Sequence, residues 1–67
     1  MSDFQVYSRI LAAARALLAA GRLTPALYAT MRDKAMLAVG NESMLYEAWL
    51  YVEDAMEDQA KGRKKNG

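Results

Sequence analysis

The segment at residues 42–60 reads ESMLYEAWLYVEDAMEDQA, and it indicates what the rest of the chain must form. It carries the chain's only tryptophan, two of its four tyrosines and six of its eight acidic residues, and it has no lysine or arginine. Apolar side chains recur at helical spacing through the segment and define an inward stripe of Leu45, Ala48, Trp49, Val52 and Met56. The pattern predicts a helix that packs one face against a core.

This helix has more apolar residues than one stripe requires. Tyr46 and Leu50 lie on one flank beside Glu53, whereas Met44, Tyr51 and Ala55 lie on the other. A surplus of this kind indicates a second surface that another molecule covers. We expect the partner-binding residues to be Tyr46, Trp49, Leu50, Tyr51 and Glu53. In the alternative interpretation Trp49 is a core residue, and Tyr46, Leu50 and Tyr51 close a homodimer.

A second helix is predicted upstream, because Thr24 suits an N-cap, Pro25 suits the first helical position and Leu23 can staple onto Tyr28. Gly40 and Asn41 end it, and Asn41 or Ser43 can cap the next helix. Its expected buried stripe is Leu27, Tyr28, Met31, Ala35, Ala38 and Val39. We expect Arg32, Asp33 and Lys34 to face away. Met36 and Leu37 fall outside the stripe near the helix end, where a third helix or a second subunit could cover them.

The first helix is predicted to begin after Ser2, which forms a capping box with Gln5, and to end at Gly21. Its expected core face consists of Phe4, Tyr7, Ile10, Leu11, Ala14, Leu17 and Leu18. The opposite side is a smooth run of alanines between Arg9 and Arg15. Alanine at these positions permits close helix approach, or simply favours helix.

The predicted fold class is all-α, with helices at about 3–20, 25–39 and 42–60 in one helical domain of residues 1–60. Residues 61–67 are expected to form a disordered basic tail. Short connections favour antiparallel neighbours, either in a compact three-helix unit or in an open one completed by a second copy. A chain of 67 residues has a small core, and this one has no cysteine or histidine for disulfides or metal sites. We therefore expect a helical homodimer.

Charge is segregated along the chain although the net charge is only +1. Residues 1–41 carry five basic side chains, residues 42–60 are purely acidic, and the basic residues Lys61, Arg63, Lys64 and Lys65 follow. The acidic helix either faces the arginines of the first helix or binds a basic partner.

Enzymatic chemistry has no support in these residues. A serine nucleophile has no histidine to activate it, and no glycine-rich phosphate loop is present. The carboxylate pairs Glu53/Glu57 and Asp54/Asp58 are better explained as a solvated face than as a cation site. We expect a protein that is not an enzyme and that binds no cofactor or metal.

Nucleic-acid binding is the alternative function, through the basic tail or through the surface around Arg9 and Arg15. A helix-turn-helix interpretation fails because the third helix would present carboxylates to a polyanion. No membrane role is expected, since arginines interrupt the N-terminal apolar stretch and the most aromatic helix is acidic. The lack of a signal-peptide pattern and of cysteine fits a cytoplasmic protein.

In length, helix count and the cluster Tyr46, Trp49, Leu50 and Tyr51, the chain resembles very small all-helical accessory proteins of bacteriophages and mobile elements. Phage quorum-sensing anti-activators are among them, and these proteins act by binding host proteins. The resemblance implies an inhibitor or adaptor whose partner is a host protein such as a transcription factor or a motor ATPase.

Overall fold

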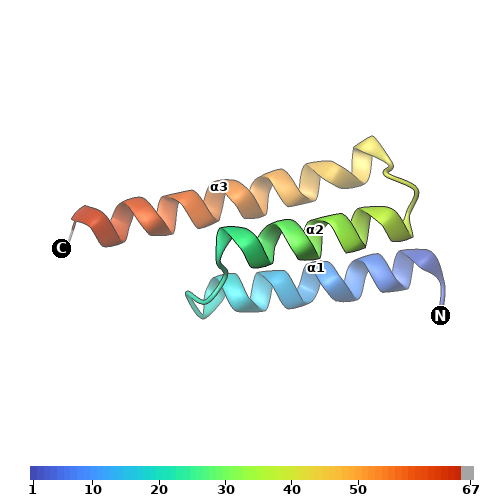
Figure 1. The fold of residues 1–67 in the computed structure, drawn as a ribbon, viewed down its shortest axis with the longest axis horizontal. Coiled ribbons are helices and arrows are strands. Elements are labelled where there is room, and N and C mark those ends of the chain that lie inside the picture. Colours follow the sequence, from blue (N-terminus) through green and yellow to red (C-terminus); the bar gives the residue numbers. More distant parts are fainter. Residues whose placement is uncertain (66–67) are drawn as a thin grey trace.

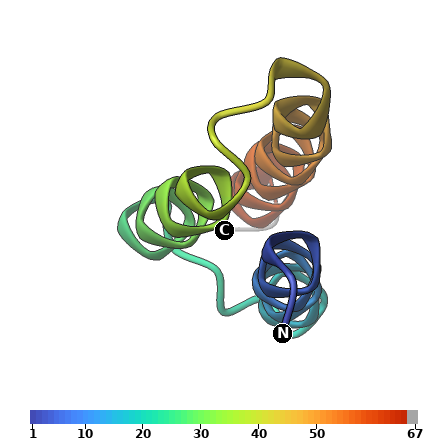
Figure 2. The ribbon, with the colours of Figure 1, turned by 90° about the vertical axis from the view of Figure 1, so that its right-hand side faces the viewer.

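The structure is a computed structural model that describes the backbone of residues 1–65 and the side chains of residues 1–62. It contains the helices α1 (Asp3–Ala19), α2 (Pro25–Ala38) and α3 (Ser43–Lys65), and no strand occurs among the described residues. The predicted all-α, three-helix fold is therefore confirmed. α1 and α2 form an antiparallel hairpin, and α3 lies along it and projects beyond the α1–α2 connection (Figure 1). Viewed from the end, the helices occupy the corners of a triangle (Figure 2).

Both helix starts of the hairpin follow local sequence rules. The Ser2 side chain accepts a hydrogen bond from the Gln5 backbone while the Gln5 side chain accepts one from the Ser2 backbone, which completes the expected capping box. Thr24 accepts from the Leu27 backbone and Pro25 occupies the first helical position. These local bonds fix where the two helices begin.

Both helices of the hairpin end in a Schellman motif. After α1, Gly21 N donates to Leu18 O and Arg22 N donates to Leu17 O. After α2, Gly40 N donates to Leu37 O and Asn41 N donates to Met36 O. Gly21 and Gly40 have φ values of 70° and 64°, the left-handed conformation that glycine adopts without strain. The chain can therefore reverse direction within a few residues at each end.

α3 begins one residue later and ends five residues later than predicted, and this corrects the expectation of a disordered tail from Lys61. Its backbone is helical through Lys65, while residues 66 and 67 lie outside the described part of the chain. The extension has a local cause: Lys61 stands four residues after Glu57, a spacing that favours helix, and Gly62 interrupts a helix far less than proline does. The final turns of α3 extend past the rest of the fold (Figure 1).

The core contains eight buried apolar residues from all three helices and the α1–α2 connection: Tyr7, Ala14, Leu23, Tyr28, Ala35, Met36, Trp49 and Val52. Trp49 is the largest fully buried side chain, and its ring meets Tyr28 edge-on with centroids 5.9 Å apart. Two predictions were wrong, because Phe4 and Leu27 are exposed near helix ends. Met36, expected outside the stripe of α2 where a third helix could cover it, is buried.

Three side chains donate hydrogen bonds across helix boundaries to backbone carbonyls and hold α3 on the hairpin. The Tyr7 hydroxyl donates to Leu45 O, and the Tyr28 hydroxyl donates to Trp49 O over 2.8 Å. Near the other end Gln59 Nε2 donates to Leu18 O over 2.8 Å. α3 is thus attached to α1 at two points and to α2 at one.

None of the described helices has the length and hydrophobicity that a bilayer span would require.

Candidate functional site

Trp49 does not belong to a binding surface. Its exposed fraction is 0%, so no partner can touch it while the chain keeps this fold. The sequence had placed Trp49 both in the inward stripe and among the partner-binding residues, and the structure supports only the inward position. The physical reason is that the ring fills the space between all three helices, where no other side chain is as large.

Tyr46, Leu50 and Glu53 lie on the side of α3 that borders α2, and we call them the α2-side flank. Tyr46 and Leu50 remain 37% and 43% exposed, and Glu53 is half-buried. Burial raises the pKa of Tyr28 on α2, and the nearby Glu53 carboxylate raises that pKa further. The flank therefore combines two apolar side chains with a carboxylate beside α2.

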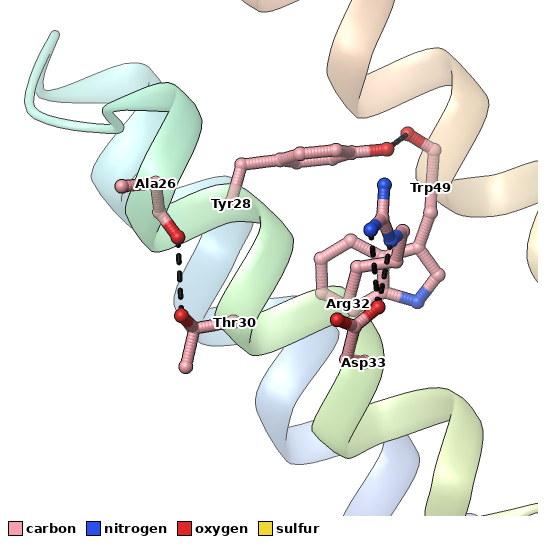
Figure 3. Close-up of polar contacts among 6 residues, drawn as sticks. All are labelled: Ala26, Tyr28, Thr30, Arg32, Asp33 and Trp49. Carbon is pink, nitrogen blue, oxygen red and sulfur yellow. Dashed lines mark hydrogen bonds and ion pairs between the residues drawn. The ribbon is translucent and has the colours of Figure 1, made fainter.

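Arg32 of α2 lies beside Tyr28 and Trp49 (Figure 3). Its guanidinium carbon lies 5.4 Å from the centroid of the Tyr28 ring, a cation–π distance. Arg32 also donates to Asp33 Oδ1 through Nε over 3.1 Å, with a second nitrogen 3.0 Å from the same oxygen. This hydrogen bond is the main cause of a raised pKa at Arg32.

The position of Arg32 overturns the expectation that it faces solvent with Asp33 and Lys34. The sequence contained a usable signal, since Arg32 follows Tyr28 by four residues, and residues at that spacing meet on one helix face. Arg32 therefore adds a positive charge to a region that had been expected to be only acidic and aromatic.

A second line of apolar residues runs along α3, and we call it the outer stripe: Met44, Ala48, Tyr51 and Ala55. Ala48 is half-buried at its border with the inward stripe and belongs to both. Met44 and Tyr51 are 80% and 74% exposed, the most open large apolar side chains of this helix. Gln59, which bonds to α1, lies between the centre of the inward stripe and the outer stripe around the helix. The outer stripe therefore borders α1, on the side away from α2.

The carboxylates of α3 find no basic partner within the described part of the chain. Glu47, Asp54, Glu57 and Asp58 are exposed, and the ion pair that does form there joins Arg32 to Asp33 within α2. The possible pairing of α3 with the arginines of α1 is therefore not seen. The acidic surface is left facing solvent next to both sets of apolar residues.

The residues of the nucleic-acid alternative do not converge on one described site. Arg9 and Arg15 are exposed on α1, and Lys61 is exposed near the end of α3. The side chains of Arg63, Lys64 and Lys65 lie outside the described ones. The structure therefore shows accessible cations but no shared surface that combines the two groups.

The described surface also has hollows, but it has no metal-binding cluster. Where the side chains are described, no group of three or more carboxylate, histidine or cysteine side chains could hold a metal ion. An open hollow of about 300 Å³ lies between the α1–α2 connection and the Met56–Ala60 part of α3, with Arg22 and Glu57 in its lining. A second hollow, of about 590 Å³, opens on the N-terminal part of α1 beside Met1 and Phe4.

Comparison of the chain with protein-family models, with curated proteins and with solved structures gave no match. The residues and their geometry alone carry the functional argument.

Proposed function

We propose that this chain is a non-enzymatic, protein-binding modulator that acts through α3 and works as a homodimer. The observation that carries the proposal is that Tyr46 and Leu50 stay exposed beside Glu53, on a helix whose inward residues, such as Trp49, already fill the core. A helix that has satisfied its own fold with one face keeps a second apolar face only at a cost in solubility. That cost is offset when the second face binds a partner.

The chemistry of the α2-side flank indicates what the partner offers. Aromatic and aliphatic side chains supply most of the contact energy at protein interfaces, while flanking charges steer encounter and select the orientation. Glu53 and the neighbouring Glu57 favour a partner with an apolar pocket bordered by lysine or arginine. The proposed partner is a host protein in the cytoplasm, such as a transcription factor or a motor ATPase, which the bound chain inhibits.

Exposed apolar side chains support the homodimer. Met44 and Tyr51 on α3 are 80% and 74% exposed, although a chain this short has only a small core of its own. Association that buries such side chains stabilises the folded chain.

The partner is tested by affinity capture from the organism that encodes the chain, with matched baits. The wild-type chain should retain a protein that both Tyr46→Ala and Leu50→Ala lose, whereas Leu37→Ala should retain it. Leu37 is 74% exposed on α2 and lies away from the flank, so it controls for general loss of apolar surface. Equal retention of the same protein by all four baits would refute the proposed site.

Nucleic-acid binding stays as a second candidate because Arg9 and Arg15 are exposed and unpaired with acidic side chains in the described residues. Such cations can contact phosphates without any sequence preference, and binding of this kind weakens steeply with salt.

A further inference from the structure

The outer stripe of α3 has the spacing of a helix-pairing seam. Its members, Met44, Ala48, Tyr51 and Ala55, follow one another at intervals of four, three and four residues. This is the spacing at which two helices interlock side chains along a common line. The two large side chains of the seam lie outside the chain's own core, since Met44 and Tyr51 are 80% and 74% exposed, whereas Ala48 and Ala55 are half-buried between them.

The sizes of the side chains make the seam complementary to itself. Large and small side chains alternate along the seam, in the order large, small, large, small. Read from the other end of the helix, the order is small, large, small, large. Two antiparallel copies with a twofold axis between Ala48 and Tyr51 bring each large side chain against a small one. Met44 then faces Ala55 of the second copy, and Tyr51 faces Ala48 of the second copy. Opposed large and small residues are what close packing between facing helices requires.

We propose that the outer stripe is the contact between two copies of this chain, with their α3 helices antiparallel across a twofold axis. The inference rests on the homodimer in the proposed function and specifies its surface. It also separates two roles on one helix. The outer stripe joins the copies, while the α2-side flank of Tyr46, Leu50 and Glu53 stays open for the partner.

The area that a stable pair needs extends beyond the stripe. Stable protein pairs bury about 800 Å² per partner, contributed by about 20–30 residues a side. The seam borders α1, because Gln59, which donates to Leu18 O of α1, adjoins the seam around the helix. A second copy seated on the stripe can therefore also reach the exposed side of α1, which supplies the remaining area.

Charge gives this dimer a distinctive salt dependence. Glu47 and Asp54 flank the stripe on its solvent side, and the antiparallel arrangement brings Glu47 of one copy near Asp54 of the other. These like charges repel weakly across an exposed rim, and salt screens them. Salt should therefore strengthen the association, whereas a dimer held by contacts between acidic α3 and basic α1 would weaken with salt.

The proposal is tested by sedimentation equilibrium on wild type, Ala48→Tyr, Tyr51→Ala and the double variant Ala48→Tyr/Tyr51→Ala. Each single change removes the match of large and small side chains, so each should weaken dimerisation at least about tenfold. The double variant exchanges the two residues and restores a large side chain opposite a small one, so its dimer should be within about threefold of wild type. Leu37→Ala is the matched control and should dimerise like wild type.

Circular dichroism on each variant checks that it folds. If Ala48→Tyr unfolds the chain, the exchange Met44→Ala/Ala55→Met tests the same alternation at the other pair of positions. Failure of the double variants to recover, or association that weakens with salt, would overturn the antiparallel seam. Dimerisation unaffected by every change would overturn the seam and leave the homodimer intact. A wild-type chain that stays monomeric would overturn the homodimer itself, without touching the partner-binding test on the α2-side flank.

Discussion

Trp49 joins the three helices at the scale of a single residue. Its ring is fully buried and meets Tyr28, while its backbone carbonyl accepts the Tyr28 hydroxyl. Its indole Nε1 finds no hydrogen-bond acceptor of suitable geometry among the described residues, although the indole lies close enough to Tyr7 to oppose the rise in the pKa of that hydroxyl. The ring therefore stabilises the fold by packing, and its N–H carries an uncompensated desolvation cost.

Because the Trp49 ring stabilises the fold while its N–H destabilises it, two substitutions at this position should have different effects. Trp49→Ala empties the centre of the core and should cost about 3–5 kcal/mol, enough to unfold much of so small a protein. Trp49→Phe keeps an aromatic ring against Tyr28 and removes the unpaired N–H, so its cost should stay within about 2 kcal/mol. Urea denaturation followed by circular dichroism measures both. Equal costs for the two variants would mean that the N–H is in fact well bonded.

Tyr7 and Tyr28 make stability sensitive to alkaline pH. Burial raises the pKa of each hydroxyl above its ordinary value of 10.0, and Glu53 adds to the effect at Tyr28. In the unfolded chain these groups ionise first, so their contribution to stability is complete below pH 10 and is lost as pH rises through the folded-state pKa. An ionised hydroxyl also cannot donate to Leu45 O or Trp49 O.

The double variant Tyr7→Phe/Tyr28→Phe should therefore lose about 1 kcal/mol per hydrogen bond at neutral pH. Its stability should then change less than that of wild type between about pH 9 and about pH 12. Thermal melts across this range measure the difference. Tyr51→Phe, at an exposed position, serves as the control and should match wild type at neutral pH. If the stability of the double variant falls at alkaline pH as much as that of wild type, groups other than Tyr7 and Tyr28 cause the fall.

At the scale of helices, the sequence predicted what local contacts decide. Ser2, Thr24 and Pro25 start helices through bonds within four residues, and Gly21 and Gly40 end them in the same local way. These features need no knowledge of the third dimension, and they were correctly placed.

The helical spacing of apolar residues predicted burial less well where a helix contacts two other helices or lies at the end of the bundle. Met36 lies off the expected stripe of α2, yet the combined cover from α1 and α3 buries it. Phe4 fits the stripe of α1, yet it is exposed because it sits at the end of the bundle and only stacks on Tyr7, with centroids 5.9 Å apart. In the candidate site, Tyr46, Leu50 and Tyr51 were placed correctly on the surface. Trp49 was correctly placed in the inward stripe but wrongly included among the partner-binding residues. Arg32 was wrongly expected to face away, because its position over Tyr28 depends on how the side chains of α2 pack.

The two described glycines with open surroundings should respond to alanine with opposite signs. An added Cβ meets no atom within 4 Å at either Gly40 or Gly62, so neither change is opposed by a clash. Gly40 has a φ of 64°, where alanine is strained, and Gly40→Ala should destabilise the chain by about 1–2 kcal/mol. Gly62 is helical, and Gly62→Ala should stabilise α3 by at most about 1 kcal/mol. Thermal melts with helix content from circular dichroism compare them directly, and the same sign for both would contradict the assignment of strain to Gly40.

At the scale of the whole molecule, the fold is elongated and carries its charges at separate places. It measures 43 by 20 by 15 Å, and its longest helix places carboxylates along one side and Lys61 beyond them. Gln59 makes the last described hydrogen bond between α3 and the hairpin, through Leu18 O.

Truncation after Ala60 separates the Gln59 hydrogen bond from the residues beyond it. Because Gln59 keeps its bond to α1, removal of residues 61–67 should leave the melting temperature nearly unchanged and reduce helix content only by the lost turns. The substitution Gln59→Ala in the full chain is the contrast and should cost about 1 kcal/mol by deleting that bond. A fall of several degrees on truncation alone would show that the removed residues pack against the fold.

The full chain and the truncated chain also test nucleic-acid binding. If the basic segment binds phosphates, any affinity of the full chain for duplex DNA should fall with salt and be lost on truncation. Affinity that survives truncation would assign it to Arg9 and Arg15, and Arg9→Ala/Arg15→Ala in the truncated chain would then have to abolish it.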